Sequence, residues 1–219
     1  MSSGTWSLMG RELKEPVLSK EAFENGFSNE GAVLGRTRFL KNIAGMWLLQ
    51  ECKRHWDAGG STLDYADLVR LAGQEELATA WLDVDAPDFT APENMPEAIV
   101  AYCQKNKIPV PTTPGQFTRL ILESLAHKYA EVKVALEKVT ERKVERIHIV
   151  GGGSLNGLLN QLAADRTGCE VVAGPVEATS LGNILMQMVA DGELESLRAG
   201  RELVARSFQV QVFKPAPVI

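Results

Sequence analysis

The spacing of apolar residues divides the chain into an irregular beginning and a more regular remainder. Residues 1–8 have the pattern of a short strand with a small-residue turn already in progress, and residues 12–35 carry Gly, Asn and Pro without a sustained period, which indicates loops and a short hairpin. Beyond residue 35, apolar residues recur at the i, i+3, i+4, i+7 spacing of amphipathic helices. This spacing predicts helices over residues 38–54, 63–72 and 97–106, with Ser61 or Thr62 capping the second.

The longest predicted helix begins at Pro114. Thr113, Pro114 and Gln116 supply a capping hydroxyl, a proline at the first helical position and an amide at the reciprocal capping position. Apolar residues then continue at helical spacing from Phe117 to Val139, which predicts one long helix with a single buried face.

The last third of the chain alternates strands and helices. An apolar strand at residues 146–150, a glycine turn, a helix at 155–166 and a second strand at 170–173 follow one another, which is the order of a βαβ unit. Further helices are expected over residues 178–190 and 194–206. The residues from 209 to 219, with two prolines, are expected to form a loosely held tail.

Composition limits the class of protein. The chain has 219 residues, 45% of them hydrophobic, and a net charge of -5, which allows one core with a small appended subdomain. The acidic balance disfavours nucleic acid and anionic membranes as partners, because both require clustered Lys and Arg. No stretch reaches the roughly 18 apolar residues that span a bilayer, and the N-terminus has no secretion signal. We therefore expect a cytoplasmic protein that binds small molecules or proteins.

The cysteines and histidines do not suggest a metal or nucleophilic site. Cys52, Cys103 and Cys169 are odd in number and unevenly spaced, which fits neither a disulfide framework nor a paired-thiolate site. The three histidines are far apart in the sequence, whereas a metal needs three or four converging ligands. No Ser, His and acid grouping stands out as a catalytic triad.

The glycine turn Gly151-Gly152-Gly153-Ser154 is the best candidate for a binding site. Such a turn between a strand and a helix exposes backbone amides and a helix N-terminus to an anion or a flat ligand. A tight packing turn without a ligand fits the glycines equally well, and both interpretations stay open. The glycine spacing does not supply G-x-G-x-x-G and no P-loop motif occurs, so a Rossmann-type oxidoreductase is only a minor alternative.

Several segments carry more specific motifs, and their order and spacing extend over nearly the whole chain. They are Ser2–Leu8, Asn29–Gly31, Leu40–Ile43, Trp47–Gln50, Ile147–Ser154, Asn156, Leu159–Leu162, Ala164–Asp165, Gly174–Thr179 and Leu181–Asn183. Together these segments resemble rhamnulokinases, which belong to the sugar kinases with the actin-like ATPase fold.

The resemblance implies an α/β fold of the ribonuclease-H-like, actin-like ATPase type, with a mixed sheet flanked by helices. Residues 1–208 are then the C-terminal, nucleotide-binding domain of a sugar kinase, with a helical and loop insertion at about 57–110 and an extended tail at 209–219. Members of the family are considerably longer than this chain, which starts at their second phosphate motif.

The resemblance also implies the residues of the site. Thr5 faces the phosphates of ATP, Gln50 lies near the nucleotide, and Gly152 lines the adenosine pocket. Gly151, Gly153 and Asn156 are neighbours of that pocket, and Asn42 reaches toward the sugar. The implied cofactors are ATP and Mg²⁺. The implied partners are ATP or ADP, a ketose sugar, and an N-terminal kinase domain that belongs to the same protein or to a separate chain.

No catalytic residue and no metal ligand is assigned within this sequence. In the family, the general base is an Asp in a His-Asp motif of the first domain, and no His-Asp pair occurs here. The expected function is the ATP-binding half of a kinase that converts L-rhamnulose to L-rhamnulose 1-phosphate, inactive alone. The alternatives are a kinase half for another sugar, such as fuculose or xylulose, and a non-catalytic nucleotide-binding or interaction module.

Overall fold

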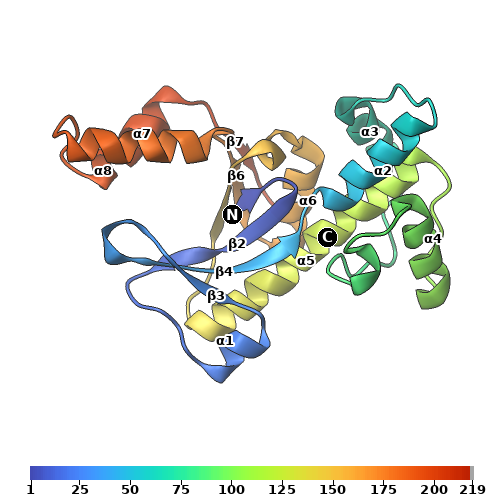
Figure 1. Ribbon diagram of the computed structural model, residues 1–219, viewed down its shortest axis with the longest axis horizontal. Coiled ribbons are helices and arrows are strands. Elements are labelled where there is room, and N and C mark those ends of the chain that lie inside the picture. Colours follow the sequence, from blue (N-terminus) through green and yellow to red (C-terminus); the bar gives the residue numbers. More distant parts are fainter. Residues whose placement is uncertain (218–219) are drawn as a thin grey trace.

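Strands form the middle layer of the computed structural model, which describes residues 1–217 (Figure 1). The first sheet is antiparallel in the order β1-β2-β4-β3; its strands are β1 (Ser2–Ser3), β2 (Trp6–Leu13), β3 (Ser28–Gly31) and β4 (Thr37–Ala44). The second sheet has the order β5-β6-β7, formed by β5 (Arg146–Ile149), β6 (Glu170–Ala173) and β7 (Gln211–Phe213). Since β5 and β6 are parallel and β6 and β7 antiparallel, the expected mixed topology is confirmed.

The two sheets join at β1. Ser2 forms a parallel bridge with Val150, the amide of Ser3 donates to the Val150 carbonyl at 2.9 Å, and the amide of Val150 donates to the Met1 carbonyl at 3.0 Å. This junction places the turn after β1 beside the glycine turn after β5, although the two are far apart in the sequence.

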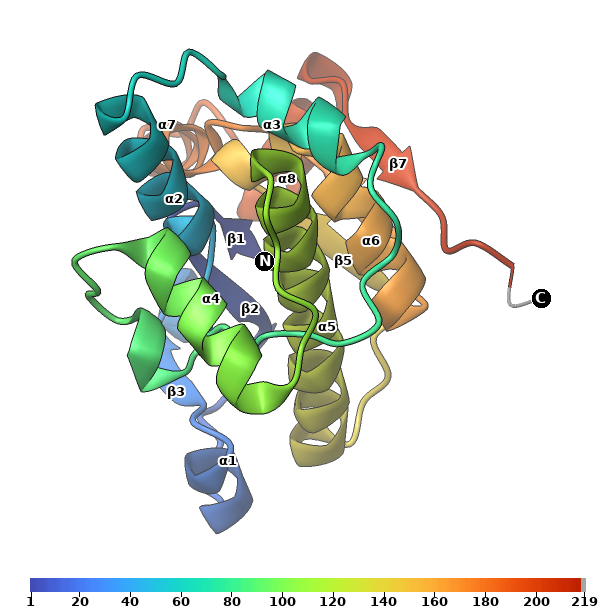
Figure 2. The same ribbon diagram turned by 90° about the vertical axis from the view of Figure 1, so that its right-hand side faces the viewer.

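One face of the strand layer is covered by α2 (Trp47–Ala58), α5 (Pro114–Thr140) and α6 (Gly157–Thr167), which lie in front of the strands in Figure 2. On β2, Ser7 faces this layer, and its hydroxyl lies 2.8 Å from the hydroxyl of the buried Tyr129 on α5. The Thr113 side chain accepts from the Gln116 amide at 3.2 Å, which confirms the predicted start of α5.

Two shorter helices lie beside this layer. α3 (Tyr65–Ala72) packs against α5, and α4 (Met95–Asn106) packs against α2. The cap of α3 is Asp64, in a reciprocal capping box with Asp67, so the prediction of Ser61 or Thr62 as the cap is wrong. A carboxylate one turn closer to the helix satisfies the first free amides instead. The turn η2 (Pro87–Phe89) precedes α4.

A buried ion cluster fixes the contact among α3, α5 and α6. Glu123 on α5 is fully buried. Its carboxylate accepts from Arg119 Nε at 2.7 Å, from Arg166 of α6 at 3.1 Å and from the Ala78 amide at 3.1 Å. Arg119 also donates to the carbonyl of Ala72 at the end of α3 at 3.3 Å. One carboxylate therefore ties two helices and a loop, and Arg119 connects it to a third helix.

The predicted helix over residues 38–54 is wrong in its first half. Residues Thr37–Ala44 form β4, and the helix α2 begins only at Trp47. The reason is burial on both faces of β4, where Phe39 and Ile43 point toward one side and Leu40 and Ala44 toward the other. A strand buried on both faces loses the alternation of apolar and polar residues that identifies strands.

Two further differences concern segments without a clear period. In the region predicted as loops and a short hairpin, the strand β3 forms a short antiparallel hairpin with β4 through the turn η1 (Val33–Gly35), but the helix α1 (Lys20–Glu24) was not predicted. In the predicted tail, β7 pairs with β6, so this part is held in the sheet rather than loose. The final part of that tail, residues 218–219, lies outside the described residues.

The last two helices project from the strand layer. α7 (Ala178–Ala190) and α8 (Leu197–Ser207) pack on one another and extend away from the other helices in Figure 1. Arg201 of α8 reaches Glu12 of β2 at 2.9 Å. Within residues 1–217, no helix combines the length and the apolar character needed to cross a membrane.

Candidate functional site

A pocket of about 610 Å³ opens where the two turns meet beside α2 and α3. It is lined by elements from four parts of the chain, which the strand junction at β1 brings together. The lining residues are Gly4, Met46, Gln50, Tyr65, Ala66, Val69, Arg70, Gly152, Gly153, Leu155 and Asn156. The pocket thus contains Gln50, Gly152, Gly153 and Asn156, all of which the sequence predicts at one site.

The Gly4–Thr5 turn is held by the backbone at the start of α2. The amides of Gly45 and Trp47 both donate to the Thr5 carbonyl at 3.1 Å, and the Met46 amide donates to the Gly4 carbonyl at 2.9 Å. Such close approach requires glycine at position 45, because a Cβ there would lie 2.6 Å from the Gly4 oxygen. The turn and α2, which carries Gln50, therefore form one rigid unit.

The glycine turn after β5 is tightly packed at two of its glycines and open at the third. Gly151 has a positive φ of 86°, and a Cβ on Gly153 would lie 2.0 Å from the Ser3 Oγ, so these two glycines permit tight packing. Gly152 differs, because a Cβ there would have no atom within 4 Å. Gly152 therefore leaves room for a ligand to approach the backbone of this turn.

Asn156 places the N-terminus of α6 at the pocket. Its side-chain oxygen accepts from the Leu159 amide at 3.0 Å, which makes Asn156 the cap of the helix. The positive end of the helix dipole favours negative charge at this place. Below the turn, the buried Asn160 donates to the Ser154 carbonyl at 2.9 Å, and this bond fixes the turn on the helix.

The α3 wall of the pocket, formed by Tyr65, Ala66, Val69 and Arg70, was not anticipated from the sequence. The predicted helix over residues 63–72 is confirmed, but no motif connects it with the glycine turn. The available signal was the spacing, since these four residues share one side of the helix while Leu68 and Ala72 are buried on the adjoining side. This spacing indicates that the four residues do not belong to the core, but it does not indicate which part of the chain they face.

The remaining predicted residues lie near the pocket but outside its lining. Thr5 is exposed in the turn after β1, directly beside Gly4. Gly151 lies at the start of the glycine turn, packed against the Ser3 carbonyl. Asn42 is exposed on β4 opposite Leu8, on the face of the sheet that points away from α5.

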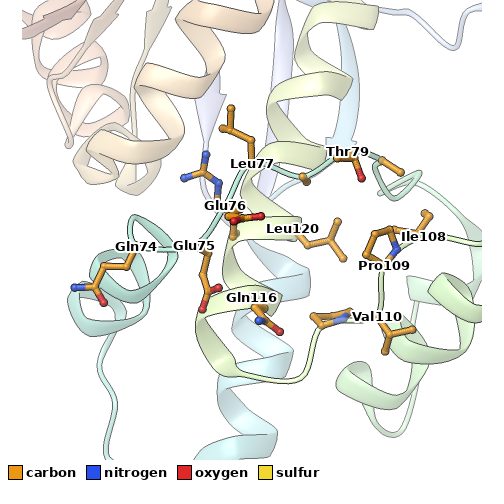
Figure 3. Close-up of a pocket in the computed structure, with 14 residues that line it drawn as sticks. Gln74, Glu75, Glu76, Leu77, Thr79, Ile108, Pro109, Val110, Gln116 and Leu120 are labelled. Carbon is orange, nitrogen blue, oxygen red and sulfur yellow. The ribbon is translucent and has the colours of Figure 1, made fainter.

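A second hollow, of about 500 Å³, shows none of the predicted residues in its lining (Figure 3). Gln116 and Leu120 of α5 point between the loop that carries Glu75 and the segment Ile108–Val110. Arg119 also lines this hollow, but its guanidinium is bound to Glu123 and Ala72. The Arg119 guanidinium is therefore already occupied by contacts within the protein.

The cysteines do not form a reactive or metal-binding site among the described residues. The thiols of Cys52, Cys103 and Cys169 are buried, and burial raises the pKa of Cys52 well above its usual range and that of Cys103 to about 11. Thiols in this state are poor nucleophiles and poor metal ligands at neutral pH. Among residues 1–217, no three His, Cys, Asp or Glu side chains converge on a point where an ion would fit.

Comparison with known proteins places this arrangement in a family. The family model described as the FGGY family of carbohydrate kinases, C-terminal domain, matches residues 1–190. The chain belongs to this kinase family. A rhamnulokinase from Enterococcus faecalis is 44% identical over 220 residues, which cover 100% of this chain and 44% of that protein. A rhamnulokinase from Bacillus subtilis is 41% identical over 218 residues, with the same shares covered.

The relatives in the FGGY family are therefore longer than this chain, which spans less than half of their length. The matched model is that of the C-terminal domain of a family of carbohydrate kinases. The aligned part is the C-terminal part of these relatives, in agreement with the resemblance seen in the sequence motifs.

Solved structures of the FGGY family share the fold. A ligand-bound xylulose kinase from Lactobacillus acidophilus matches with a TM-score of 0.66 at 13% identity, over 99% of this chain and 42% of that one. A Plasmodium falciparum glycerol kinase with ADP matches with a TM-score of 0.65 at 15% identity, over 98% and 42%. These likenesses confirm the actin-like ATPase fold.

Proposed function

We propose that this chain is the nucleotide-binding part of a kinase that transfers the γ-phosphate of ATP to L-rhamnulose and forms L-rhamnulose 1-phosphate. The observation that carries the proposal is the pocket in which Gln50, Gly152, Gly153 and Asn156 meet beside the Gly4–Thr5 turn. The choice of sugar rests on the relatives named rhamnulokinase, which align with the whole chain. We further propose that the protein acts in the cytoplasm, where a sugar kinase meets ATP.

Each part of the pocket has a proposed task. Gly152 lets the adenosine moiety approach the backbone of the glycine turn, and Gln50 contacts the nucleotide from α2. The α6 N-terminus, capped by Asn156, and the exposed Thr5 face the phosphates, because helix ends and hydroxyl groups stabilise anionic oxygens. Asn42, whose side chain is exposed on β4, is proposed to contact the sugar.

The pocket does not supply the ligands that Mg²⁺ requires. This ion prefers carboxylate and other oxygen ligands, whereas the pocket lining contains no Asp or Glu. We therefore propose no role for a metal held by the described residues of this chain. In the titration with Mg-ADP, Mg²⁺ is present only as the counter-ion of the nucleotide.

Nucleotide binding tests the proposal directly. The chain is titrated with Mg-ADP in a calorimeter, with NADH as the control for a dinucleotide site. We expect saturable binding of ADP, no binding of NADH, and at least a tenfold loss of ADP affinity, about 1.4 kcal/mol, in Gly152→Leu. The physical reason is that a side chain at position 152 fills open space at the pocket.

The matched control for this titration is Gly31→Leu. Gly31 also has no atom within 4 Å of an added Cβ, but it lies on β3 and does not line the pocket. Equal losses of affinity in the two variants would show a general disturbance of the fold. Absence of ADP binding to the unaltered chain would contradict the proposal that this chain holds a working nucleotide site.

The proposal also predicts that the chain alone does not catalyse the reaction. Phosphoryl transfer requires a donor and an acceptor held in line, with a base or positioning group at the acceptor. This sequence has no His-Asp pair to supply that base, and the chain spans only part of its relatives. We propose that the remaining part, as the other half of the enzyme or as a separate chain, provides the base and most sugar contacts.

A coupled assay that measures ADP release from ATP and L-rhamnulose tests this prediction. The expected rate for the pure chain equals that of the blank without protein, and fuculose and xylulose give the same result. Turnover of L-rhamnulose above the blank would contradict the assignment of the base to the remaining part. Turnover of fuculose or xylulose above the blank would contradict the same assignment and would also overturn the choice of L-rhamnulose as the sugar.

A further inference from the structure

The helix α3 presents one complete face to the pocket. Tyr65, Ala66, Val69 and Arg70 line it, at the spacing of one side of a helix. Leu68 and Ala72, on the side of the helix that adjoins Tyr65, are fully buried, and α3 packs against α5. One side of this short helix is therefore part of the core, and the neighbouring side forms the outer wall of the pocket.

Tyr65 is the largest side chain on the α3 wall, and it is held at a fixed place. It is the first residue of α3, directly after Asp64. Asp64 accepts from the Asp67 amide at 2.8 Å and Asp67 accepts from the Asp64 amide at 3.4 Å. This reciprocal cap orders the first turn of the helix, so the backbone under the Tyr65 ring needs no ordering when a ligand arrives.

The Tyr65 ring is open to a ligand. The residue is 46% exposed although its neighbours Ala66, Val69, Met46 and Leu155 give the pocket a mostly apolar lining. The Lys53 ammonium lies 5.7 Å from the centre of the ring, where it is attracted to the π-electrons, and it is itself bound to Asp57 at 2.7 Å.

Gly152 also lines the pocket, and a Cβ built on it would meet no atom within 4 Å. A bare peptide surface and an aromatic ring are both flat, and together they suit a planar heteroaromatic group. Stacking between an aromatic side chain and a nucleic acid base contributes about 1–3 kcal/mol by alanine substitution.

We infer that Tyr65 binds the base of the bound nucleotide by stacking its ring on the planar base, and that α3 is the base-stacking wall of the pocket. This inference rests on the proposed function, since it deepens the assignment of the same pocket. It gives a binding task to a helix within the segment of about 57–110, which the sequence identified only as an insertion.

The test compares three ligands in three forms of the chain. Unaltered chain, Tyr65→Ala and Tyr65→Phe are each titrated with ADP, with adenosine and with inorganic tripolyphosphate. We expect Tyr65→Ala to weaken ADP and adenosine roughly tenfold and to leave tripolyphosphate unchanged. Tyr65→Phe keeps the ring and is expected to bind all three ligands within about twofold of the unaltered chain.

A spectroscopic readout separates stacking from a merely structural role. Addition of adenosine is expected to shift the ring protons of Tyr65 upfield in the NMR spectrum, with the assignment made by their loss in Tyr65→Phe. Phe23→Ala is the matched control, because Phe23 is an exposed aromatic residue on α1 that does not line the pocket. It should change neither the affinities nor the ring shifts.

The outcomes distinguish the two proposals. Absence of ADP binding to the unaltered chain overturns the proposed function and this inference together. ADP binding that Tyr65→Ala leaves unchanged overturns only the inference. Equal weakening of adenosine and tripolyphosphate in Tyr65→Ala also overturns it, because the ring would then maintain the shape of the pocket rather than contact the base.

Discussion

Replacing Glu123 by alanine is expected to lower the free energy of unfolding by about 3–5 kcal/mol, the usual cost of removing one partner from a buried ion pair. Arg119, whose side chain is only 10% exposed, would keep its charge without a carboxylate to neutralise it. The Ala78 amide and Arg166 would lose their acceptor at the same time. Urea denaturation followed by circular dichroism measures the change.

Glu131→Ala is the matched control for the buried cluster. Glu131 lies two turns further along α5, and its side chain is 55% exposed where it pairs with Lys128. An exposed pair of this kind contributes about 0–1 kcal/mol, so the control should unfold at nearly the same urea concentration as the unaltered chain. A loss below about 1 kcal/mol in Glu123→Ala would show that the cluster is not needed to hold the helices together.

Replacing Gly153 by alanine is expected to cost about 2–3 kcal/mol, because overpacking of a tight site forces the backbone to shift. The added Cβ would lie 2.0 Å from the Ser3 Oγ and 2.5 Å from the Ser3 Cβ. This clash falls at the junction of the two sheets and at the edge of the pocket. We therefore expect the variant to lose both stability and affinity for ADP, measured by urea denaturation and by calorimetry.

The clash at Gly153 is with a side chain, so a second substitution can relieve it. Ser3→Gly removes both clashing atoms, and the double variant is expected to regain at least half of the stability lost in Gly153→Ala. Gly152→Ala is the control in the same turn, since its Cβ meets no atom within 4 Å. If Ser3→Gly gave no recovery, the clash would not be the cause of the loss.

Features that depend on neighbouring residues were predicted from the sequence, whereas features that depend on distant residues were not. The cap at Thr113 and the βαβ unit from β5 to β6 follow from short patterns, and both are confirmed. The strand β4 was misread as helix, because its apolar residues serve two faces and their spacing imitates a helical period. The pairing of β7 with β6 depends on residues nearly 40 positions apart, which no local period can reveal.

In the candidate site, too, residues within motifs were predicted and contacts between distant residues were not. Gln50, Gly152, Gly153 and Asn156 were predicted from motifs, and the structure brings them to one pocket. The α3 wall escaped prediction, because an apolar and aromatic helical face has the same sequence pattern whether it meets a ligand, a partner or solvent. The different surroundings of Gly152 and Gly153 could not be predicted either, since they depend on the position of the distant Ser3. The domain boundary at residue 208 stays a prediction.

The bond between Ser3 and Val150 has a consequence for the order in which the described residues fold. A contact between such distant residues closes a long loop, and closing a long loop costs more chain entropy than closing a short one. We therefore expect local units such as α5 to form before this contact. Gly152 and Asn156 meet Gly4 only once the strand junction at β1 has closed, so the pocket is completed after the helices that form its walls.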